Sequence, residues 1–289
     1  MTPDRAGPIS EASTSDDAIE DVIEDVIEDV IEELERLALE LARDSAKLLL
    51  DHLGEAHTAI DTKSSATDMV SEVDRASEAL IVEGIRSARP QDGILGEEGT
   101  DHAGTSGVRW VIDPLDGTTN YLYGLPGFAV SIGIEVDGIT RLGVVLDPFH
   151  DEVFVARRGG GATCNGRAIA HNDCTDLGSA LVGTGFGYDP ARRAEQGAVV
   201  GRLLPHVRDI RRVGACALDL CWVACGRLDA YYERGPQPWD HTAGLLIAAE
   251  SGAATVWTEI GSPSGDLVAA GGPAILDALL AHVQPQGPA

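Results

Sequence analysis

The spacing of apolar residues changes along the chain. Apolar positions recur with helical spacing over residues 34–53 and again over 70–85, so both segments are expected to be helices. A short strand or loop is expected between them, at 57–63. Apolar runs within 128–156, joined by turn residues, predict consecutive strands of an antiparallel meander. This part of the chain therefore has an α+β pattern.

From Ser179 onward, strand-like apolar runs alternate with segments of helical spacing. Strands are expected at 180–184, 208–213, 229–233, 253–257 and 267–270, and helices at 191–204, 215–225, 239–250 and 273–282. Such alternation is typical of an α/β layer with a mixed sheet. A cleft is expected where the two parts of the chain meet.

The N-terminal segment is strongly acidic and of low complexity. Residues 1–18 are rich in Ser, Asp, Pro and Ala and are expected to be disordered, and residues 19–31 repeat Ile-Glu-Asp-Val with a period of four. In a helix, the apolar pairs would drift by about 40° per repeat. The repeat either extends the following helix, docks on a partner, or is a functionless extension. We divide the chain into an arm at 1–33, a first lobe at 34–185 and a second lobe at 186–289.

Composition and charge exclude several classes of protein. A chain of 289 residues with 44% hydrophobic content can bury a large core. Its net charge of −26 argues against nucleic acids or anionic membranes as partners. The sequence shows neither a membrane-spanning apolar run nor the layout of a signal peptide, so a cytoplasmic protein is expected. Five cysteines without a CxxC pair indicate neither a disulfide framework nor a zinc site.

Two acids stand at the end of an apolar run, where a buried strand gives way to a helix. The run 110–112 ends in Asp113-Pro114, and Asp116-Gly117 follows as a turn that opens a helix. Pro114 favours an extended backbone at the preceding residue, and Gly117 permits a sharp turn. The two carboxylates can therefore point toward one place.

Clustered carboxylates need a positive partner. Two of them ~4 Å apart repel each other by roughly 4 kcal/mol at an effective dielectric constant of about 20. The stretch contains no His or Cys, and a purely oxygen ligand set suits Mg²⁺, Mn²⁺ or Ca²⁺ rather than Zn²⁺. The N–H groups of Gly117 and Thr118 at the helix start would suit a phosphate. The alternative interpretation is a solvated, Asp-rich turn.

Further acids lie at similar points of the predicted fold. Glu97 and Glu98 follow the short strand expected at 93–96, and Asp240 lies in the first turn of a helix. Alone, the first pair is explained by a surface loop and Asp240 by the helix dipole. In order and spacing, however, three motifs resemble the signatures of the inositol monophosphatase family: Gly96-Glu97-Glu98, the stretch 113–120, and Trp239-Asp240.

This resemblance extends from about Leu34 to the C-terminus. The stretches 183–188, 211–214, 217–221 and 229–233 resemble the bacterial, actinobacterial-type inositol-1-monophosphatases more closely. The resemblance implies a layered αβαβα sandwich, usually found as a homodimer. It also implies a Mg²⁺-dependent phosphatase that Li⁺ inhibits and in which metal-activated water attacks the phosphate directly.

The resemblance also implies roles for individual residues. Glu97, Asp113 and the carbonyl of Leu115 would hold one Mg²⁺, while Asp113, Asp116 and Asp240 would hold a second; a third, weaker ion would share Glu97 and waters. Glu97, Thr118 and Asp74 would be catalytic, with Thr118 hydrogen-bonded to Asp74 to orient the attacking water, and the N–H groups of Gly117 and Thr118 would bind phosphate. Lys63 corresponds to a basic residue on the third-metal side.

The substrate pocket follows from the same resemblance. Glu233 matches the family's inositol-binding glutamate, and the pocket would be lined by Asp116, Gly214, Ala215, Cys216 and Asp240. Cys216 departs from the alanine usual at that position. The expected substrate is myo-inositol 1-phosphate. Alternatives are related sugar phosphates such as fructose bisphosphate, histidinol phosphate or nucleotide 3′-phosphates, or a mainly binding or regulatory role through the N-terminal arm.

Overall fold

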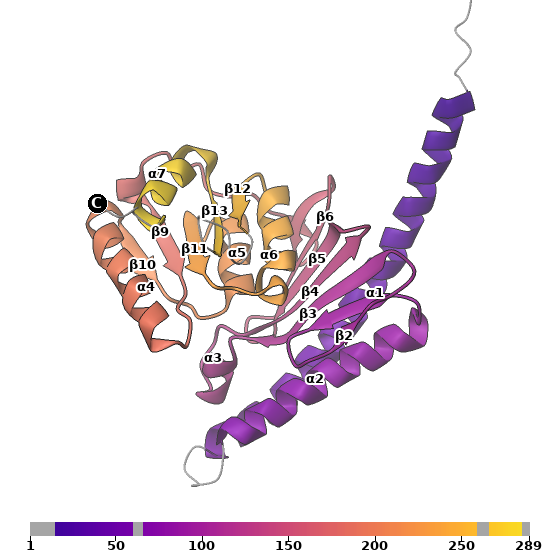
Figure 1. The fold of residues 1–289 in the computed structure, drawn as a ribbon, viewed down its shortest axis with the longest axis horizontal. Helices are drawn as coiled ribbons and strands as arrows, with labels where there is room; N and C mark the ends of the chain where they lie inside the picture. The colour runs from indigo at the N-terminus through magenta and orange to yellow at the C-terminus, as the bar shows by residue number, and fades with distance from the viewer. Residues whose placement is uncertain (1–14, 60–65, 259–265, 285–289) are drawn as a thin grey trace, which may run out of the picture.

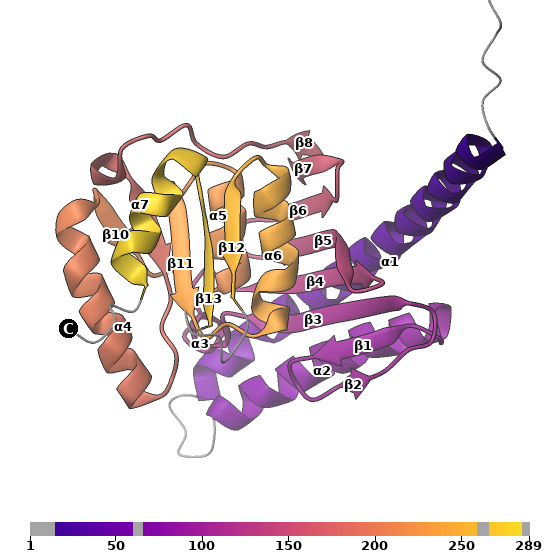
Figure 2. The ribbon, with the colours of Figure 1, turned by 45° about the horizontal axis from the view of Figure 1, so that its top comes forward.

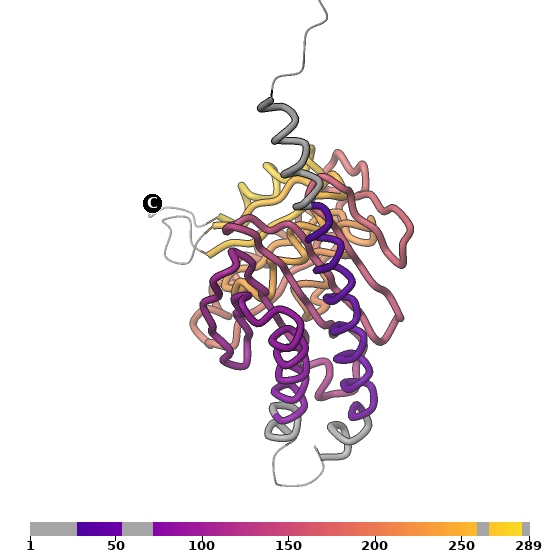
Figure 3. The backbone as a smooth tube through the Cα atoms, turned by 90° about the vertical axis from the view of Figure 1, so that its right-hand side faces the viewer, coloured from indigo at the N-terminus to yellow at the C-terminus, as the bar shows by residue number. Residues whose placement is uncertain are grey.

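The computed structural model describes residues 15–59, 66–258 and 266–284. Side chains are described for residues 28–53, 72–258 and 266–284. Two long helices, α1 (Ser15–Ala59) and α2 (Ala66–Ala88), run side by side, as Figure 3 shows. Both cover one face of a large sheet. The two helices expected at 34–53 and 70–85 are thereby confirmed.

The first sheet has eight strands in the order β2-β1-β3-β4-β5-β6-β7-β8. Its strands are β1 (Gly93–Gly96), β2 (Asp101–His102), β3 (Val108–Asp116), β4 (Ala129–Val136), β5 (Ile139–Asp147), β6 (Glu152–Arg157), β7 (Gly161–Cys164) and β8 (Arg167–Ala168). From β3 to β8 neighbouring strands are antiparallel, which confirms the predicted meander. Only the β1–β3 pairing is parallel. A short helix, α3 (Thr118–Leu122), follows β3 directly.

The second sheet has five strands in the order β10-β9-β11-β13-β12. They are β9 (Leu181–Thr184), β10 (Asp209–Arg211), β11 (Ala230–Arg234), β12 (Ala254–Trp257) and β13 (Leu267–Gly271), and two single-turn helices lie at Leu177–Ser179 and Leu204–His206. The sheet is mixed, as predicted, because β9 pairs in parallel with β10 and β11 whereas β13 is antiparallel to its neighbours. It already begins with β9, before residue 186.

The layers stack as helices, sheet, helices, sheet, helices (Figures 1 and 2). Helices α5 (Cys216–Ala224) and α6 (Pro238–Glu250) lie between the two sheets, and α4 (Pro190–Leu203) and α7 (Pro273–Val283) lie against the outer face of the second sheet. Four apolar clusters fill the four spaces between these layers. The predicted αβαβα sandwich is confirmed.

Helix α1 departs from the prediction at both ends. Its helical backbone begins at Ser15, inside the segment expected to be disordered, and continues through 57–59, where a strand or loop was expected. Adding a residue to an existing helix gains a hydrogen bond without a new nucleus, so a strong central helix extends into weak flanking sequence. Residues 1–14 and 60–63 lie outside the described part of the chain.

The arm and the first lobe share this helix, so the acidic repeat extends the core helix. Ile31, within the arm as defined, is buried in the first core cluster. Arg157 on β6 forms ion pairs with Glu28, Glu32 and Glu35 of α1. Among the described helices, none has the length and apolar content that crossing a membrane requires.

Candidate active site

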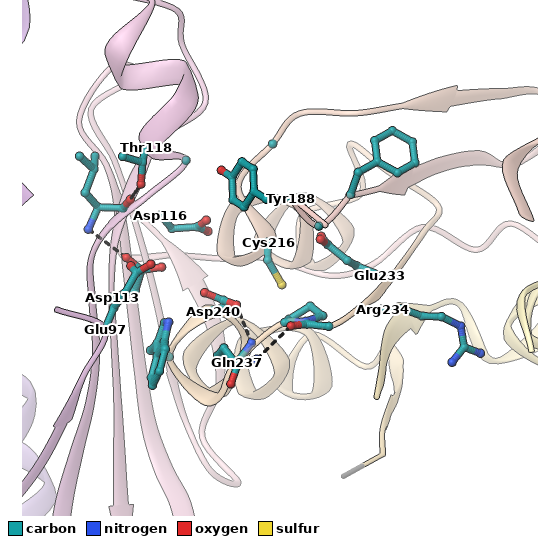
Figure 4. Close-up of a pocket in the computed structure, with 18 of the residues that line it drawn as sticks. Glu97, Asp113, Asp116, Thr118, Tyr188, Cys216, Glu233, Arg234, Gln237 and Asp240 are labelled. Carbon is teal, nitrogen blue, oxygen red and sulfur yellow. Dashed lines mark hydrogen bonds between the residues drawn. The ribbon is translucent and has the colours of Figure 1, made fainter. Parts of the chain in front are cut away.

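A pocket opens where elements of both sheets meet the helices between them. The end of β3 and the start of α3 form one wall, and the loops after β9 and β10 with the end of β11 form the opposite wall. The start of α6 forms the floor between them. Figure 4 shows the acids Glu97, Asp113, Asp116 and Asp240 gathered toward one side of this pocket.

A β-bulge brings two of these acids to the same side. Residues three apart on a regular strand point to opposite faces. Asp113 pairs with Ser131 and Asp116 with Ala129, so β3 uses one residue more than its partner β4 between these points. Pro114 lies in the bulge, where a residue without an N–H is tolerated. Both carboxylates are buried and line the pocket.

The remaining acids come from the start of α6 and the end of β1. Because β1 runs parallel to β3, the backbone N–H of Glu97 donates to the carbonyl of Ile112 at 3.2 Å, which sets Glu97 beside Asp113. Asp240 accepts a hydrogen bond from the Gln237 N–H at 2.6 Å, closing a capping box. Glu98 lies 3.5 Å from Arg75 and is not part of the pocket lining.

The acids raise one another's pKa. Burial is the largest cause at Asp113 and Asp116, whose pKa values lie well above the usual range, followed by repulsion from Glu97 at Asp113 and from Asp240 at Asp116. Burial likewise raises the pKa of Asp240 to about 7 and raises that of Glu97. Such a cluster is stable near neutral pH only with bound protons or a cation.

The donor set fits a hard cation. It consists of carboxylate oxygens and the carbonyl of Leu115, and Asp113 lies close enough to Glu97 and Asp240 for their charges to raise its pKa. Within the described residues, no group of three or more His, Cys, Asp or Glu side chains is arranged so that it could hold a metal ion. Mg²⁺ commonly binds through one or two carboxylates, with waters and substrate phosphate completing its shell. Two neighbouring carboxylates can therefore be enough protein ligands for one Mg²⁺.

Thr118 and Asp74 are close to the acid cluster but are not hydrogen-bonded to each other. The Thr118 hydroxyl donates to the carbonyl of Leu115 at 3.1 Å, three residues earlier. Asp74 is buried, and its Oδ1 has no hydrogen-bond partner among the described residues. Burial, followed by repulsion from Glu97, raises the Asp74 pKa to about 8. The expected Thr118–Asp74 bond is thus replaced by a local one within the turn.

Gly117 is required at the turn between β3 and α3. Its φ of 90° lies in the left-handed region, and a Cβ there would come 2.5 Å from the carbonyl oxygen of Gly127. On the opposite wall, Gly214, Cys216 and Glu233 line the pocket. Ala215 is buried at the start of α5 and does not line it. Lys63 lies outside the described residues.

The lining residues to which sequence reasoning assigned no role include Tyr188, Arg212 and Gln237. The Tyr188 hydroxyl lies 3.2 Å from that of Thr119, linking the two walls at the pocket mouth. Arg212 is a cation facing an acidic pocket, and it lies in a stretch that the resemblance had marked. Tyr188 lies in another such stretch, 183–188, so the resemblance was a usable signal for both residues.

Comparison with known proteins identifies the relatives of this fold. Residues 30–286 match the model of the inositol monophosphatase family. The chain belongs to the inositol monophosphatase family. Like other members of it, this chain is a phosphatase. It is 44% identical to "Inositol-1-monophosphatase SuhB" of Mycobacterium tuberculosis, over 86% of this chain and 91% of that protein.

Other relatives support the same family membership. The solved structure of Mycobacterium tuberculosis SuhB matches with a TM-score of 0.76 and 41% identity, covering 87% of this chain and 96% of that one. A protein of Salmonella typhimurium named "Nus factor SuhB" is 38% identical, over 86% of this chain and 94% of its own length. The family membership therefore rests on both sequence and fold.

Proposed function

We propose that this phosphatase hydrolyses inositol monophosphate, with myo-inositol 1-phosphate as the leading candidate, to inositol and phosphate. The observation that carries the proposal is the pocket's two-sided design, with buried acids on one wall and Glu233 on the other. A phosphate ester needs cations at its phosphoryl end, and a polyol needs hydrogen-bond acceptors at its other end. The name of the mycobacterial relative, an inositol-1-monophosphatase, supports this substrate.

We further propose Mg²⁺ as the cofactor, at two or three ions per site. Glu97, Asp113 and the Leu115 carbonyl would hold one ion; Asp113, Asp116 and Asp240 would hold a second; Glu97 would share a weaker third. When bound, such ions neutralise the phosphoryl charge and make a bound water more acidic. The raised pKa values of the acids support this assignment because a cation relieves the same repulsion as a proton.

The chain's own groups would then bind the phosphate and orient the attacking water. The N–H groups of Gly117 and Thr118 would receive phosphate oxygens, and the Thr118 hydroxyl, with Asp74 nearby, would direct the attacking water. Cys216 is the thiol that lines the pocket, and burial raises its pKa well above the usual range. A protonated thiol is a poor nucleophile, so direct attack by water without a phosphoenzyme is favoured.

A panel of phosphate esters tests the proposal. The panel comprises myo-inositol 1-phosphate, fructose bisphosphate, histidinol phosphate, a nucleoside 3′-phosphate and 4-nitrophenyl phosphate, each measured with Mg²⁺ and with EDTA. We expect the highest kcat/KM for the inositol ester and loss of all activity with EDTA. A higher kcat/KM for another ester would reassign the substrate, and full activity in EDTA would refute the proposed metal requirement.

Lithium provides an independent check on the metal arrangement. Li⁺ is a small cation of low charge, and it is expected to inhibit by occupying the second metal position, at Asp113, Asp116 and Asp240. Inhibition should weaken as Mg²⁺ is raised in initial-rate assays. K⁺ at the same ionic strength is the control. Insensitivity to high millimolar Li⁺ would contradict this arrangement of ligands.

A homodimer is also proposed, on the resemblance to the family alone. Sedimentation of the full chain across a range of protein concentrations measures the oligomeric state directly. Mass action shifts a reversible dimer toward monomer on dilution. A single monomeric species at every concentration would contradict the proposal.

A further inference from the structure

The carboxylate of Glu233 is held by its own strand. Tyr231 and Glu233 are two residues apart on β11, so their side chains project from the same face. Tyr231 is completely buried, and its hydroxyl donates to Glu233 Oε2 at 2.5 Å. Within the described part of the chain, this is the one hydrogen bond that the Glu233 carboxylate makes. A tyrosine behind the pocket therefore determines where this acceptor points.

The residue that follows a neighbouring strand leaves the space that the Glu233 carboxylate occupies. Gly185 follows β9, which runs parallel to β11 and pairs Thr184 with Tyr232. A Cβ at residue 185 would overlap the Glu233 carboxylate itself. The backbone of Gly185 does not have a positive φ, so its lack of a side chain matters for space rather than for conformation. Figure 4 shows the oxygens of Glu233 on the side of Cys216.

We propose that Tyr231 and Gly185 are positioning residues, which hold the Glu233 carboxylate as a fixed acceptor for a substrate hydroxyl and thereby set a preference for polyol phosphates. The inference rests on the proposed function, in which Glu233 receives that hydroxyl. A preorganised acceptor binds more tightly because its rotamers are already restricted before the substrate arrives. A phosphate ester without such a hydroxyl gains nothing from it.

Tyr231→Phe tests the hydrogen bond while keeping the buried ring. We expect KM for myo-inositol 1-phosphate to rise about tenfold with kcat within about twofold, as for loss of one hydrogen bond to a charged group. The kinetic constants for 4-nitrophenyl phosphate, an aryl ester without polyol hydroxyls, should not change. Tyr232→Phe is the matched control, because Tyr232 points to the opposite face and packs in the outer apolar cluster.

Gly185→Ala independently tests whether the Glu233 carboxylate needs the space beside residue 185, since the added methyl group must displace that carboxylate. The same selective rise in KM for the inositol ester is expected. Gly197→Ala is the matched control, because a Cβ at that position of α4 meets no other atom within 4 Å. If Gly185→Ala fails to fold, Tyr231→Phe alone decides.

The two substrates separate failure of this inference from failure of the proposed function. Equal losses on both esters in Tyr231→Phe, or no loss on either, would overturn the inference. In Tyr231→Phe combined with Glu233→Gln, the loss on the inositol ester should match that of Glu233→Gln alone; additive losses would also overturn it. A wild-type enzyme that does not favour the inositol ester over the aryl ester would instead refute the proposed function.

Discussion

At the scale of single residues, the acids that line the pocket and the buried Asp74 beside them repel one another when they are ionised. Asp74 and Asp240 have pKa values raised to about 8 and about 7, chiefly by burial. Between the pKa of an unfolded Asp, 3.8, and about 8, the folded protein therefore holds protons that the unfolded chain has released. Folding is favoured by these protons, and the benefit disappears as the pH rises through the folded pKa values.

The first prediction concerns stability against pH. With EDTA present, the Tm of the chain should fall as the pH rises from about 5 to about 8, because the buried acids lose their protons. Mg²⁺ should raise Tm more at pH 8 than at pH 5, where protons compete for the same oxygens. Calorimetry measures both trends. Asp74→Asn should weaken the dependence of Tm on pH in EDTA. A Tm that rises with pH in EDTA would contradict it.

The second prediction separates activity from stability at one acid. Asp113→Asn should lower kcat by at least about a hundredfold, since a ligand of the first and second proposed ions is lost. Its Tm in EDTA should be unchanged or higher, because one member of a repelling cluster is removed. Glu98→Gln is the control, since Glu98 faces Arg75 rather than the pocket. Near-normal turnover in Asp113→Asn would count against the metal assignment.

At the scale of elements, α1 joins the acidic repeat to the body of the enzyme. Its described contacts with the sheet begin at Glu28, which pairs with Arg157, and Ile31 is 5% exposed within the core. Arg157 is partly buried and contacts three glutamates, so this network is worth more than an isolated surface pair. The boundary at residue 33 therefore falls inside a packed helix.

Two truncations test this boundary as the third prediction. Removing residues 1–27 should leave kcat/KM and Tm unchanged, because the described contacts with the sheet remain. Removing residues 1–33 takes away Ile31 and two partners of Arg157, and should lower the unfolding free energy by about 2–4 kcal/mol. Chemical denaturation measures both. A change of oligomeric state in the shorter truncation would instead support the docking role of the repeat.

At the scale of the whole molecule, α6 connects the two sheets. It packs on β3, β4 and β5 on one side and on β12 and β13 on the other, and it begins next to Asp240. Glycines let it approach closely: a Cβ at Gly143 on β5 would lie 2.7 Å from the carbonyl oxygen of Ala243. The position of Asp240 thus depends on packing far from the pocket.

The fourth prediction follows from this packing. Gly143→Ala should reduce the unfolding free energy by about 1–3 kcal/mol and lower kcat, because α6 must move away from the sheet and take Asp240 with it. Gly201→Ala on α4 is the control, since its Cβ meets no other atom within 4 Å, and it should leave kcat unchanged. Loss of stability without any loss of kcat would show that the two are not coupled.

Much of this architecture could be predicted from the sequence, for physical reasons that differ between elements. Long periodic segments such as α6 and β5 carry strong signals, whereas the two-residue strands β2 and β8 carry almost none. The acids of the pocket were found because strand ends and turn residues mark them. The bulge at Pro114, which makes Asp113 and Asp116 face the same side, depends on pairing with β4 and could not be derived from β3 alone.

Contacts between distant segments set the other limits of prediction. The Thr118 hydroxyl takes the nearby Leu115 carbonyl, and sequence spacing cannot decide between that local acceptor and Asp74, which lies on another helix. In the same way, nothing in the sequence shows that Gly185 makes room for Glu233, because the two meet only when β9 and β11 are paired.

The walls of the pocket belong to different sheets, and this separation has an evolutionary consequence. Asp113 and Asp116, which would perform the chemistry, are carried by β3, whereas Glu233 is carried by β11 of the second sheet and Gly185 directly follows β9 of that sheet. Mutations in the second sheet can remodel what the enzyme recognises while its reactive machinery stays intact. A lineage built on this scaffold can exchange one alcohol moiety for another in small steps, each of which passes through a working catalyst.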